Sequence, residues 1–231
     1  MPAVTQSLLI ANVAIFFLEA SGMLPLGAFA LWPPGGFESQ FQPWQLVTYA
    51  FLHGSLGHLF FNMLALYMFG GEIERLFGSR FYTLYYFACV VSAAISHLLV
   101  NAWIGGPPLP TVGASGGIFG LLLAYGLYFP ERRVMLLIPP IPMRARTLVI
   151  VFAIMELAFG WYFPQRRVML IIPPIPMPAR VFVASYGILE LVLGVTGTAS
   201  GVAHFAHLGG MLGGFLMIQY RRGGFPFGPR R

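Results

Sequence analysis

The chain has 231 residues, and its 13 basic and 7 acidic side chains make up 9% of it, against about 25% in a typical soluble domain. Hydrophobic residues make up 58% and the mean hydropathy is +0.78, which excludes both a water-soluble globule and a disordered chain. The single cysteine excludes a disulfide scaffold. What remains is an all-α polytopic membrane protein with about six or seven crossings of roughly 20 residues each.

The charged residues are of only two kinds. Every basic residue is arginine and every acidic residue is glutamate, so a Ser-His-Asp triad is excluded because the chain has no aspartate. The arginines stand in short clusters between apolar runs, where they orient a membrane protein. They form no basic stripe with interleaved aromatic residues, so the net charge of +6 does not indicate binding to nucleic acid.

The first half of the chain predicts two membrane helices joined by a long loop. Residues 7–20 form an apolar run without a basic leader or a small-residue cleavage site, which favours a first helix that is retained. Residues 25–47, rich in Pro, Gly and Trp, predict a partly apolar loop at the membrane interface. The second helix is expected over residues 47–69, followed by a loop over residues 70–80.

Further apolar stretches follow in the second half. Residues 81–104 predict a third helix, residues 105–112 a Gly/Pro loop and residues 114–129 a fourth helix. A last apolar stretch, residues 199–219, precedes a basic tail, residues 221–231. If the arginines that follow the second, fourth and last helices face the cytoplasm, so do both ends of the chain.

A tandem repeat lies between the fourth and the last helix. Two units, residues 128–161 and 162–195, begin with the nearly identical stretches YFPERRVMLLIPPIPMRAR and YFPQRRVMLIIPPIPMPAR. Each unit is a basic loop followed by one apolar segment. Because two crossings here would make the fourth and last helices antiparallel, we expect one copy, the first, not to cross the membrane fully.

The fourth predicted helix opens with a serine among glycines, in the stretch GASGGIFG (113–120). Small neighbours expose the hydroxyl of Ser115, and the free N–H groups of a helix start can stabilise an oxyanion, which suits a nucleophile. The alternative is helix packing, because Gly116 and Gly120 have the Gly-xxx-Gly spacing common in membranes.

The last apolar stretch contains two histidines, in AHFAHLGGMLGG (203–214). His207, Gly210 and Gly214 lie on one helical stripe, so that a partner helix can approach His207 closely. A histidine in a membrane helix is costly and by default functional. A plain hydrogen bond to another helix remains the alternative for His207, and it is the favoured reading for His204.

The second predicted helix carries a third polar group, in HGSLGHLFFN (53–62). His58 and Asn62 are four residues apart and share a helix face, where two neutral donors could hold an oxyanion. Helix packing and a metal site are the alternatives, but the chain has one cysteine and no His-Glu-x-x-His motif, which disfavours a metal. His97, in the third predicted helix, is isolated and reads as structural.

Together these segments resemble the rhomboid intramembrane serine proteases. The shared patterns are His-x4-His-x3-Asn, Gly-Ala-Ser-Gly and Ala-His before Leu-Gly-Gly, and GGEIERLFGS with Glu74 is similar to the family's Gly-Gly-x-x-Glu loop. The resemblance spans residues 1–127 and 179–220. It implies a six-helix rhomboid-like bundle over residues 1–220, here with the tandem repeat between helices 4 and 6.

The resemblance also implies roles for individual residues. Ser115 would be the nucleophile and His207 the general base, without a carboxylate, a metal ion or a cofactor. His58, Asn62 and the backbone N–H of Ser115 would bind the oxyanion. Support around the cavity would come from four more residues: His53 as lining or loop anchor, Phe119 against the His207 ring, and the motif glycines Gly113 and Gly210.

Two features depart from the family pattern. Trp44-Gln45 stands where the family typically has Trp-Arg in its first loop, and the tandem repeat replaces a single loop and fifth helix. The expected activity is hydrolysis of peptide bonds in or near transmembrane helices of membrane-protein substrates, in a bacterial plasma membrane. A rhomboid-like pseudoprotease that binds membrane clients and a proton-relaying transporter are the rivals. The sequence does not indicate a particular substrate, an oligomeric state or a role for Cys89.

Overall fold

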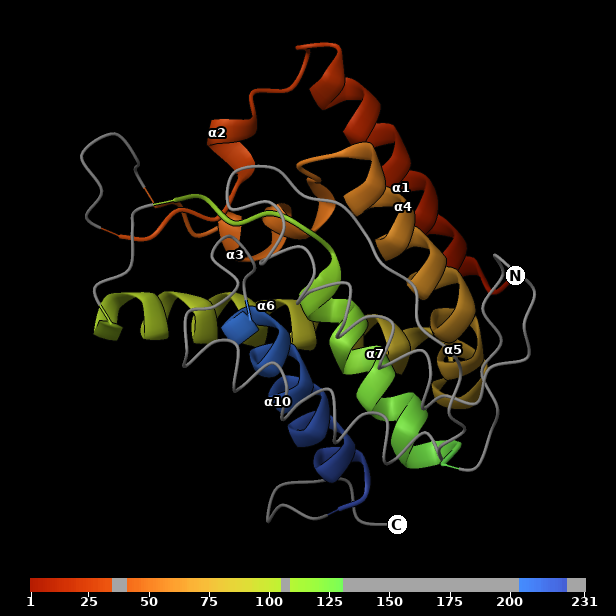
Figure 1. Ribbon diagram of the computed structural model, residues 1–231. Coiled ribbons are helices and arrows are strands. Elements are labelled where there is room, and N and C mark those ends of the chain that lie inside the picture. Colours follow the sequence, from red (N-terminus) through yellow and green to blue (C-terminus); the bar gives the residue numbers. More distant parts are fainter. Residues whose placement is uncertain (35–40, 105–108, 131–203, 224–231) are drawn as a thin grey trace, which may run out of the picture. The chain divides into compact units, whose positions relative to one another are not determined.

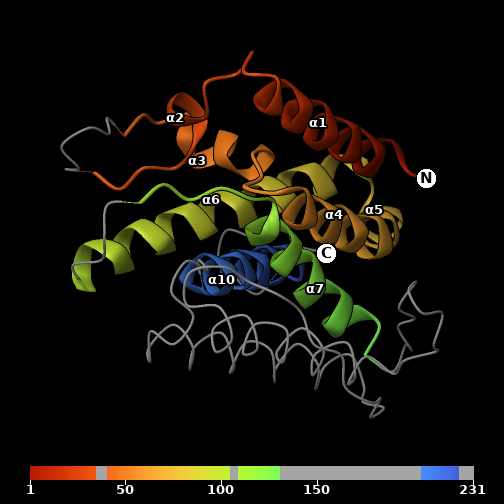
Figure 2. The same ribbon diagram turned by 45° about the horizontal axis from the view of Figure 1, so that its top comes forward.

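The computed structural model describes residues 1–34, 41–104, 109–130 and 204–223, and every regular element among them is a helix (Figures 1 and 2). The prediction of an all-helical chain is thus confirmed for these residues. The tandem repeat lies outside them except for its first three residues, and so does most of the basic tail. The chain divides into two compact units, residues 1–124 with 205–231 and residues 125–204, and the candidate site lies within the first.

Ten helical elements are described. They are α1 (Ala3–Ala20), α2 (Leu26–Phe29), α3 (Gln45–Thr48), the 3₁₀-helix η1 (Tyr49–Phe51), α4 (Leu56–Ala65), the π-helix η2 (Leu66–Gly70), α5 (Gly71–Phe77), α6 (Ser79–Ile104), α7 (Ser115–Tyr128) and α10 (His204–Arg221). Among the described residues, α1 and residues Ser79–Trp103 of α6 are long and apolar enough to cross a membrane.

The predicted boundaries of the second helix are wrong at both ends. The helix that carries His58 begins at Leu56, because Ser55 is extended (φ −163°, ψ 159°) and its hydroxyl accepts the backbone N–H of His58 at 3.1 Å as an N-cap. At the other end, the predicted loop over residues 70–80 is mostly helical. The chain continues through η2 and α5 and stops at Gly78, whose φ of +76° favours glycine.

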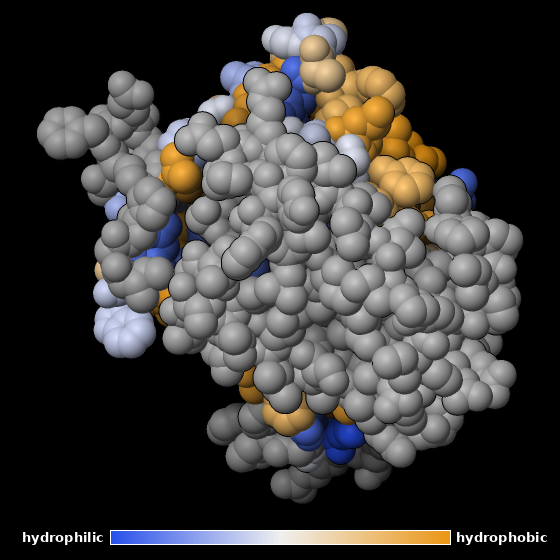
Figure 3. Space-filling model, in the orientation of Figure 1, coloured by the Kyte–Doolittle hydropathy of each residue, from blue (hydrophilic) through white to orange (hydrophobic). Residues whose placement is uncertain are grey.

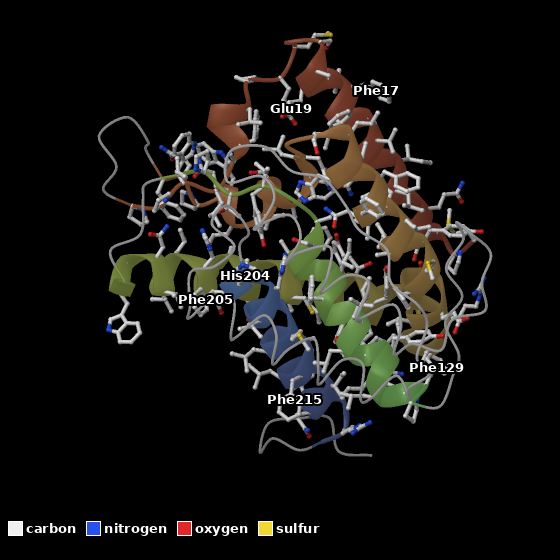
Figure 4. The ribbon with its side chains drawn as sticks, in the orientation of Figure 1. Phe17, Glu19, Phe129, His204, Phe205 and Phe215 are labelled. Atoms are coloured by element: carbon white, nitrogen blue, oxygen red, sulfur yellow. The ribbon has the colours of Figure 1, made fainter. Side chains whose placement is uncertain are left out.

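Helix α1 has an inverted distribution of polarity. Its buried residues are Thr5, Leu8 and Asn12, on the side that contacts α4 and η2. Its exposed large hydrophobic side chains are Ile10, Val13, Phe17 and Leu18, whereas its exposed polar residues, Gln6 and Ser7, lie near its start. The orange surface over α1 in Figure 3 and the outward position of Phe17 in Figure 4 follow this pattern. A helix with polar groups inside and apolar groups outside is suited to lipid rather than water.

A buried carboxylate fixes the start of α1. Glu74 of α5 is 2% exposed, and its carboxylate accepts the backbone N–H groups of Val4 (3.0 Å) and Thr5 (2.8 Å). The hydroxyls of Thr5 (2.8 Å) and Ser79 (2.7 Å) also donate to it. Burial opposes ionisation of Glu74, but these four hydrogen bonds outweigh it and hold the pKa of the carboxyl below its usual value. The carboxylate therefore caps α1 from a distant part of the chain.

Helix α6 is the central support of this unit. It contributes the fully buried Tyr82, Tyr85 and Tyr86, and its Val90 carbonyl accepts the hydroxyl of buried Tyr49 at 2.8 Å. The hydroxyl of Tyr85 reaches across to the carbonyl oxygen of Gly120 in α7 at 2.7 Å. These bonds satisfy the hydroxyls of Tyr49 and Tyr85, which would be costly to bury alone, and they fix α6 against η1 and α7.

The segment before α4 is anchored by a neutral side chain. Gln45 is 1% exposed, and its amide accepts the backbone N–H of Trp32 (3.3 Å) and donates to the carbonyl of Ala28 (3.3 Å). The indole N–H of Trp44 donates to the same Ala28 carbonyl at 3.0 Å. The Trp44-Gln45 pair thus holds this segment by hydrogen bonds that involve no charged side chain.

Candidate active site

The structure brings together the serine and the histidine that the sequence singled out. Ser115 is the first residue of α7, and His207 lies in the first turn of α10, 92 residues later. Ser115 Oγ and His207 Nε2 are 2.9 Å apart, which is hydrogen-bonding distance. His207 is 7% exposed and Ser115 is half-buried, so this contact is partly screened from solvent.

An aromatic ring fixes the plane of the His207 imidazole. Phe119 lies one helical turn after Ser115, and its ring stacks on that of His207 with centroids 4.2 Å apart and an interplanar angle of 9°. Ser115 and Phe119 lie on the same face of α7. Helix α7 therefore contacts the His207 imidazole twice: Ser115 contacts its Nε2, and Phe119 stacks on the face of its ring. Rotation of the ring away from Ser115 would break the stacking.

Glycines allow α7 and α10 to approach closely enough for this contact. A methyl group added to Gly210 would overlap the carbonyl oxygen of Gly116, and one added to Gly214 would lie 3.2 Å from the Cα of Gly120. The contacts advance in the same direction along both chains, so the two helices run parallel. Parallel helices whose first turns touch hold Ser115 and His207 at the same level.

The other face of α10 rests on α6. A methyl group added to Gly209 would meet the side chain of Ser96 at 2.5 Å, and one added to Gly213 would meet that of Ser92 at 2.6 Å. At its far end, the Arg221 guanidinium lies over the rings of Phe77 (4.5 Å) and Phe81 (5.0 Å). Helix α10 is therefore held along its length by α6 and α7, which leaves His207 little freedom to shift.

His58 and Asn62 reach the same region from α4, through Gly113. A side chain at Gly113 would lie 2.8 Å from the His58 ring and 3.7 Å from Asn62 Nδ2, and the φ of +130° at this position itself requires glycine. Gly113 stands two residues before Ser115. The two predicted oxyanion residues therefore flank the chain that leads into α7.

Asn62 has an unused donor. The residue is 8% exposed, and its Nδ2 has no hydrogen-bond partner among the described residues. A buried amide N–H without a partner costs about 1–3 kcal/mol, so its presence needs an explanation. A ligand oxygen that arrives during function would supply the missing acceptor.

His53 lies in the short segment between η1 and α4. It is 1% exposed, and its ring makes an edge contact with that of His58, with centroids 5.0 Å apart and an interplanar angle of 66°. His53 therefore contacts the His58 ring from a buried position. In the described part of the chain, no three His, Cys, Asp or Glu side chains are placed to hold a metal ion.

Comparison with known proteins identifies the family. A model of the rhomboid domain matches residues 40–223, which is most of the chain. The chain belongs to the rhomboid family. This confirms the resemblance drawn from the motifs, and rhomboids are integral membrane proteins, in agreement with the apolar α1 and α6.

Several rhomboid proteins align with the chain in part. Rhomboid protease GluP of Bacillus subtilis is 39% identical over 79 residues, which cover 34% of this chain and 14% of GluP. Rhomboid protease GlpG of Klebsiella pneumoniae is 28% identical over 120 residues, 51% of this chain and 41% of GlpG. The mitochondrial rhomboid protein 1 of Saccharomyces cerevisiae is 34% identical over 105 residues, 42% and 28% of the two chains. Each alignment covers less than half of the relative's own length.

Two contacts near the site of this rhomboid escaped the sequence analysis. His97 is not isolated: its Nε2 lies 2.8 Å from the hydroxyl of Thr111, four residues before Ser115. The backbone N–H of Gly113 donates to the carbonyl of Tyr49 at 2.9 Å. Neither contact has a signal in the sequence, because each joins residues from separate elements that only the fold brings together.

Proposed function

We propose that this rhomboid is an intramembrane serine endopeptidase that hydrolyses peptide bonds in or near transmembrane helices of membrane-protein substrates. The observation that carries the proposal is the 2.9 Å separation between Ser115 Oγ and His207 Nε2 at the start of two parallel helices. A serine within hydrogen-bonding reach of a base whose ring is itself oriented is the signature of an activated nucleophile.

In the proposed mechanism, Ser115 and His207 act as a dyad. His207 Nε2 accepts the hydroxyl proton as Ser115 Oγ attacks the carbonyl carbon of the scissile bond, and it then returns the proton to the leaving amine. Water hydrolyses the acyl-enzyme in the second half of the reaction, with His207 again as the base. Stacking on Phe119 holds the imidazole in the orientation that both transfers need.

The oxyanion of the tetrahedral intermediate would be bound by His58, Asn62 and the backbone N–H of Ser115. The first N–H groups of α7 have no intrahelical partner, and the positive end of the helix dipole points toward the nucleophile. The Nδ2 of Asn62 supports this role, because it is buried and has no hydrogen-bond partner in the part of the chain that the structure describes, so it is a donor already desolvated before substrate arrives. Each such donor contributes about 3–4 kcal/mol to the transition state.

The substrate would be a membrane protein that reaches the dyad from within the bilayer. Its helix must unwind locally, because an intact helix hides its peptide bonds, so small or helix-breaking residues are expected near the cut. The arginine positions support a plasma-membrane protein with both ends of the chain in the cytoplasm. The dyad would then lie below the outer surface, where water can enter.

The proposal is tested with the full chain in liposomes that contain a reporter transmembrane substrate. We expect the wild type to cleave the reporter and to react with a fluorophosphonate at Ser115, and the Ser115→Ala variant to do neither. Ser21→Ala, at an exposed serine beyond the end of α1, is the matched control and should cleave normally. A folded wild-type protein that binds the reporter without cleavage or labelling would refute the protease proposal in favour of the pseudoprotease.

A further inference from the structure

The loop that leads into α7 is held from two sides at Thr111. Its backbone pairs with Leu31 in an isolated antiparallel bridge, in which Thr111 donates at 2.9 Å and accepts at 3.0 Å. Its hydroxyl makes the 2.8 Å hydrogen bond with Nε2 of His97 on α6. Thr111 therefore joins the segment before α4, the loop before α7 and the central helix α6.

The chain between Thr111 and the proposed nucleophile, Ser115, is short and held in place. Only three residues separate Thr111 from Ser115, and the middle one, Gly113, donates its N–H to the carbonyl of Tyr49 and packs against the ring of His58. A displacement at Thr111 therefore passes directly to the first turn of α7. The oxyanion region and Ser115 would move together.

Helix α6 supports the other half of the dyad as well. Ser96, the neighbour of His97 in sequence, forms the surface on which Gly209 of α10 rests, next to His207. One stretch of α6 thus contacts the loop that carries Ser115 through a hydrogen bond and the helix that carries His207 through close packing. Because α6 is linked both to the loop before Ser115 and to the helix that carries His207, it sets the distance between Ser115 and His207.

We propose that His97 is a positioning residue, which ties the loop over residues 109–114 to α6 through Thr111 and thereby holds Ser115 in register with His207. This inference rests on the proposed function. Either neutral tautomer of His97 can make the bond, because a threonine hydroxyl both donates and accepts. A polar side chain inside a membrane helix is costly, and a loop that must keep a precise position gives this one a reason to be there.

The tie is tested with Thr111→Val, which removes the hydroxyl at nearly constant shape, and with Thr111→Ser, which keeps it. The first readout needs no activity: amide hydrogen exchange of residues 109–116 in the full chain in detergent micelles. We expect Thr111→Val to exchange faster over this loop, and Thr111→Ser to exchange like the wild type. The exchange of α1, which lies away from the tie, serves as the internal reference in each sample.

The second readout is the rate of Ser115 labelling by a fluorophosphonate, together with kcat and KM for the reporter substrate. Thr111→Val and His97→Leu should each slow labelling and lower kcat by about tenfold or more with KM nearly unchanged, because misplacement near a reacting atom affects the transition state. Thr111→Ser, which keeps the hydroxyl, should retain the labelling rate and the kcat of the wild type. The double variant, which combines Thr111→Val with His97→Leu, should lose no more labelling rate or kcat than either single variant, because both substitutions remove the same hydrogen bond.

Loop exchange in Thr111→Val that matches the wild type would overturn the inference, and so would single-variant losses that multiply in the double variant. Equal losses of labelling rate and kcat in Thr111→Ser and Thr111→Val would overturn the inference too, because the hydroxyl would then be irrelevant. If the wild type itself is neither labelled nor active while the loop exchange changes as expected, the tie stands and the proposed protease function fails.

Discussion

Replacing Gly210 with alanine tests whether the proposed dyad depends on the close approach of α7 and α10. The new methyl group would overlap the carbonyl oxygen of Gly116, so the helices must separate by about 1 Å or more. A shift of that size stretches the 2.9 Å Ser115–His207 contact beyond the roughly 3.5 Å limit of a hydrogen bond. We expect kcat for the reporter substrate to fall by about 100-fold, and overpacking to lower stability by about 1–3 kcal/mol.

Gly27→Ala is the matched control, because a methyl group at Gly27 in α2 would meet nothing within 4 Å. Cleavage in liposomes and thermal unfolding in detergent are measured for both variants, with the rate expressed per folded molecule. Gly27→Ala should match the wild type in both. Wild-type cleavage by folded Gly210→Ala would refute the reasoning, because the dyad would then tolerate a wider helix spacing.

Three further predictions follow from single contacts. Asn62→Leu should lower kcat by about 100-fold or more without lowering the melting temperature, because the lost amide donor has no hydrogen-bond partner among the described residues; a stability loss with unchanged kcat would contradict this. Phe119→Ala should slow fluorophosphonate labelling by about tenfold, since stacking worth about 0.5–1.5 kcal/mol no longer orients His207; labelling at the wild-type rate would refute the orienting role. The depressed pKa of Glu74 means that the carboxylate stabilises the fold above the unfolded-state pKa of about 4.3 and that this stability is lost as the pH falls through the lower folded-state pKa. Melting temperatures measured against pH should therefore decline on acidification in the wild type and stay flatter in Glu74→Gln, which should be less stable at neutral pH; parallel curves would exclude Glu74 as the cause.

The sequence predicted most of the fold where composition alone decides structure. The apolar runs of α1, α6 and α7 are long and uniform, so their presence and approximate bounds follow from hydropathy. The start of the second helix does not follow from hydropathy, because apolar residues run on through Tyr49 and Leu52. The four non-helical residues 52–55 separate η1 from α4, and the side chain of Ser55 caps α4. Its extension through Gly70 and Gly71 depends on packing of α1, which no local pattern records.

The parts of the candidate site that lie within one motif follow from the spacing of residues in that motif. His58 and Asn62 share a helix face, and the pairing of Ser115 with His207 follows from the family resemblance. The tie between His97 and Thr111 could not be found in this way, because a lone histidine and a loop threonine have no helical register in common. The anchor at Gln45 was hidden for a different reason: a neutral amide replaces the expected arginine, and only the fold shows which backbone groups it satisfies.

The proposed Ser-His dyad cannot use an aspartate to orient its histidine, because the chain contains none. In a Ser-His-Asp triad, a hydrogen bond to the second ring nitrogen fixes the tautomer and the ring plane. Here the ring plane is fixed by stacking on Phe119, and the ring position is fixed by the contact between Gly116 and Gly210. Both depend on van der Waals packing, which does not weaken inside a membrane and buries no charge. The residues that pack α7 against α10 would therefore orient His207 in place of a triad aspartate. For this reason, a single methyl group at Gly210 should lower kcat as much as the loss of an oxyanion donor.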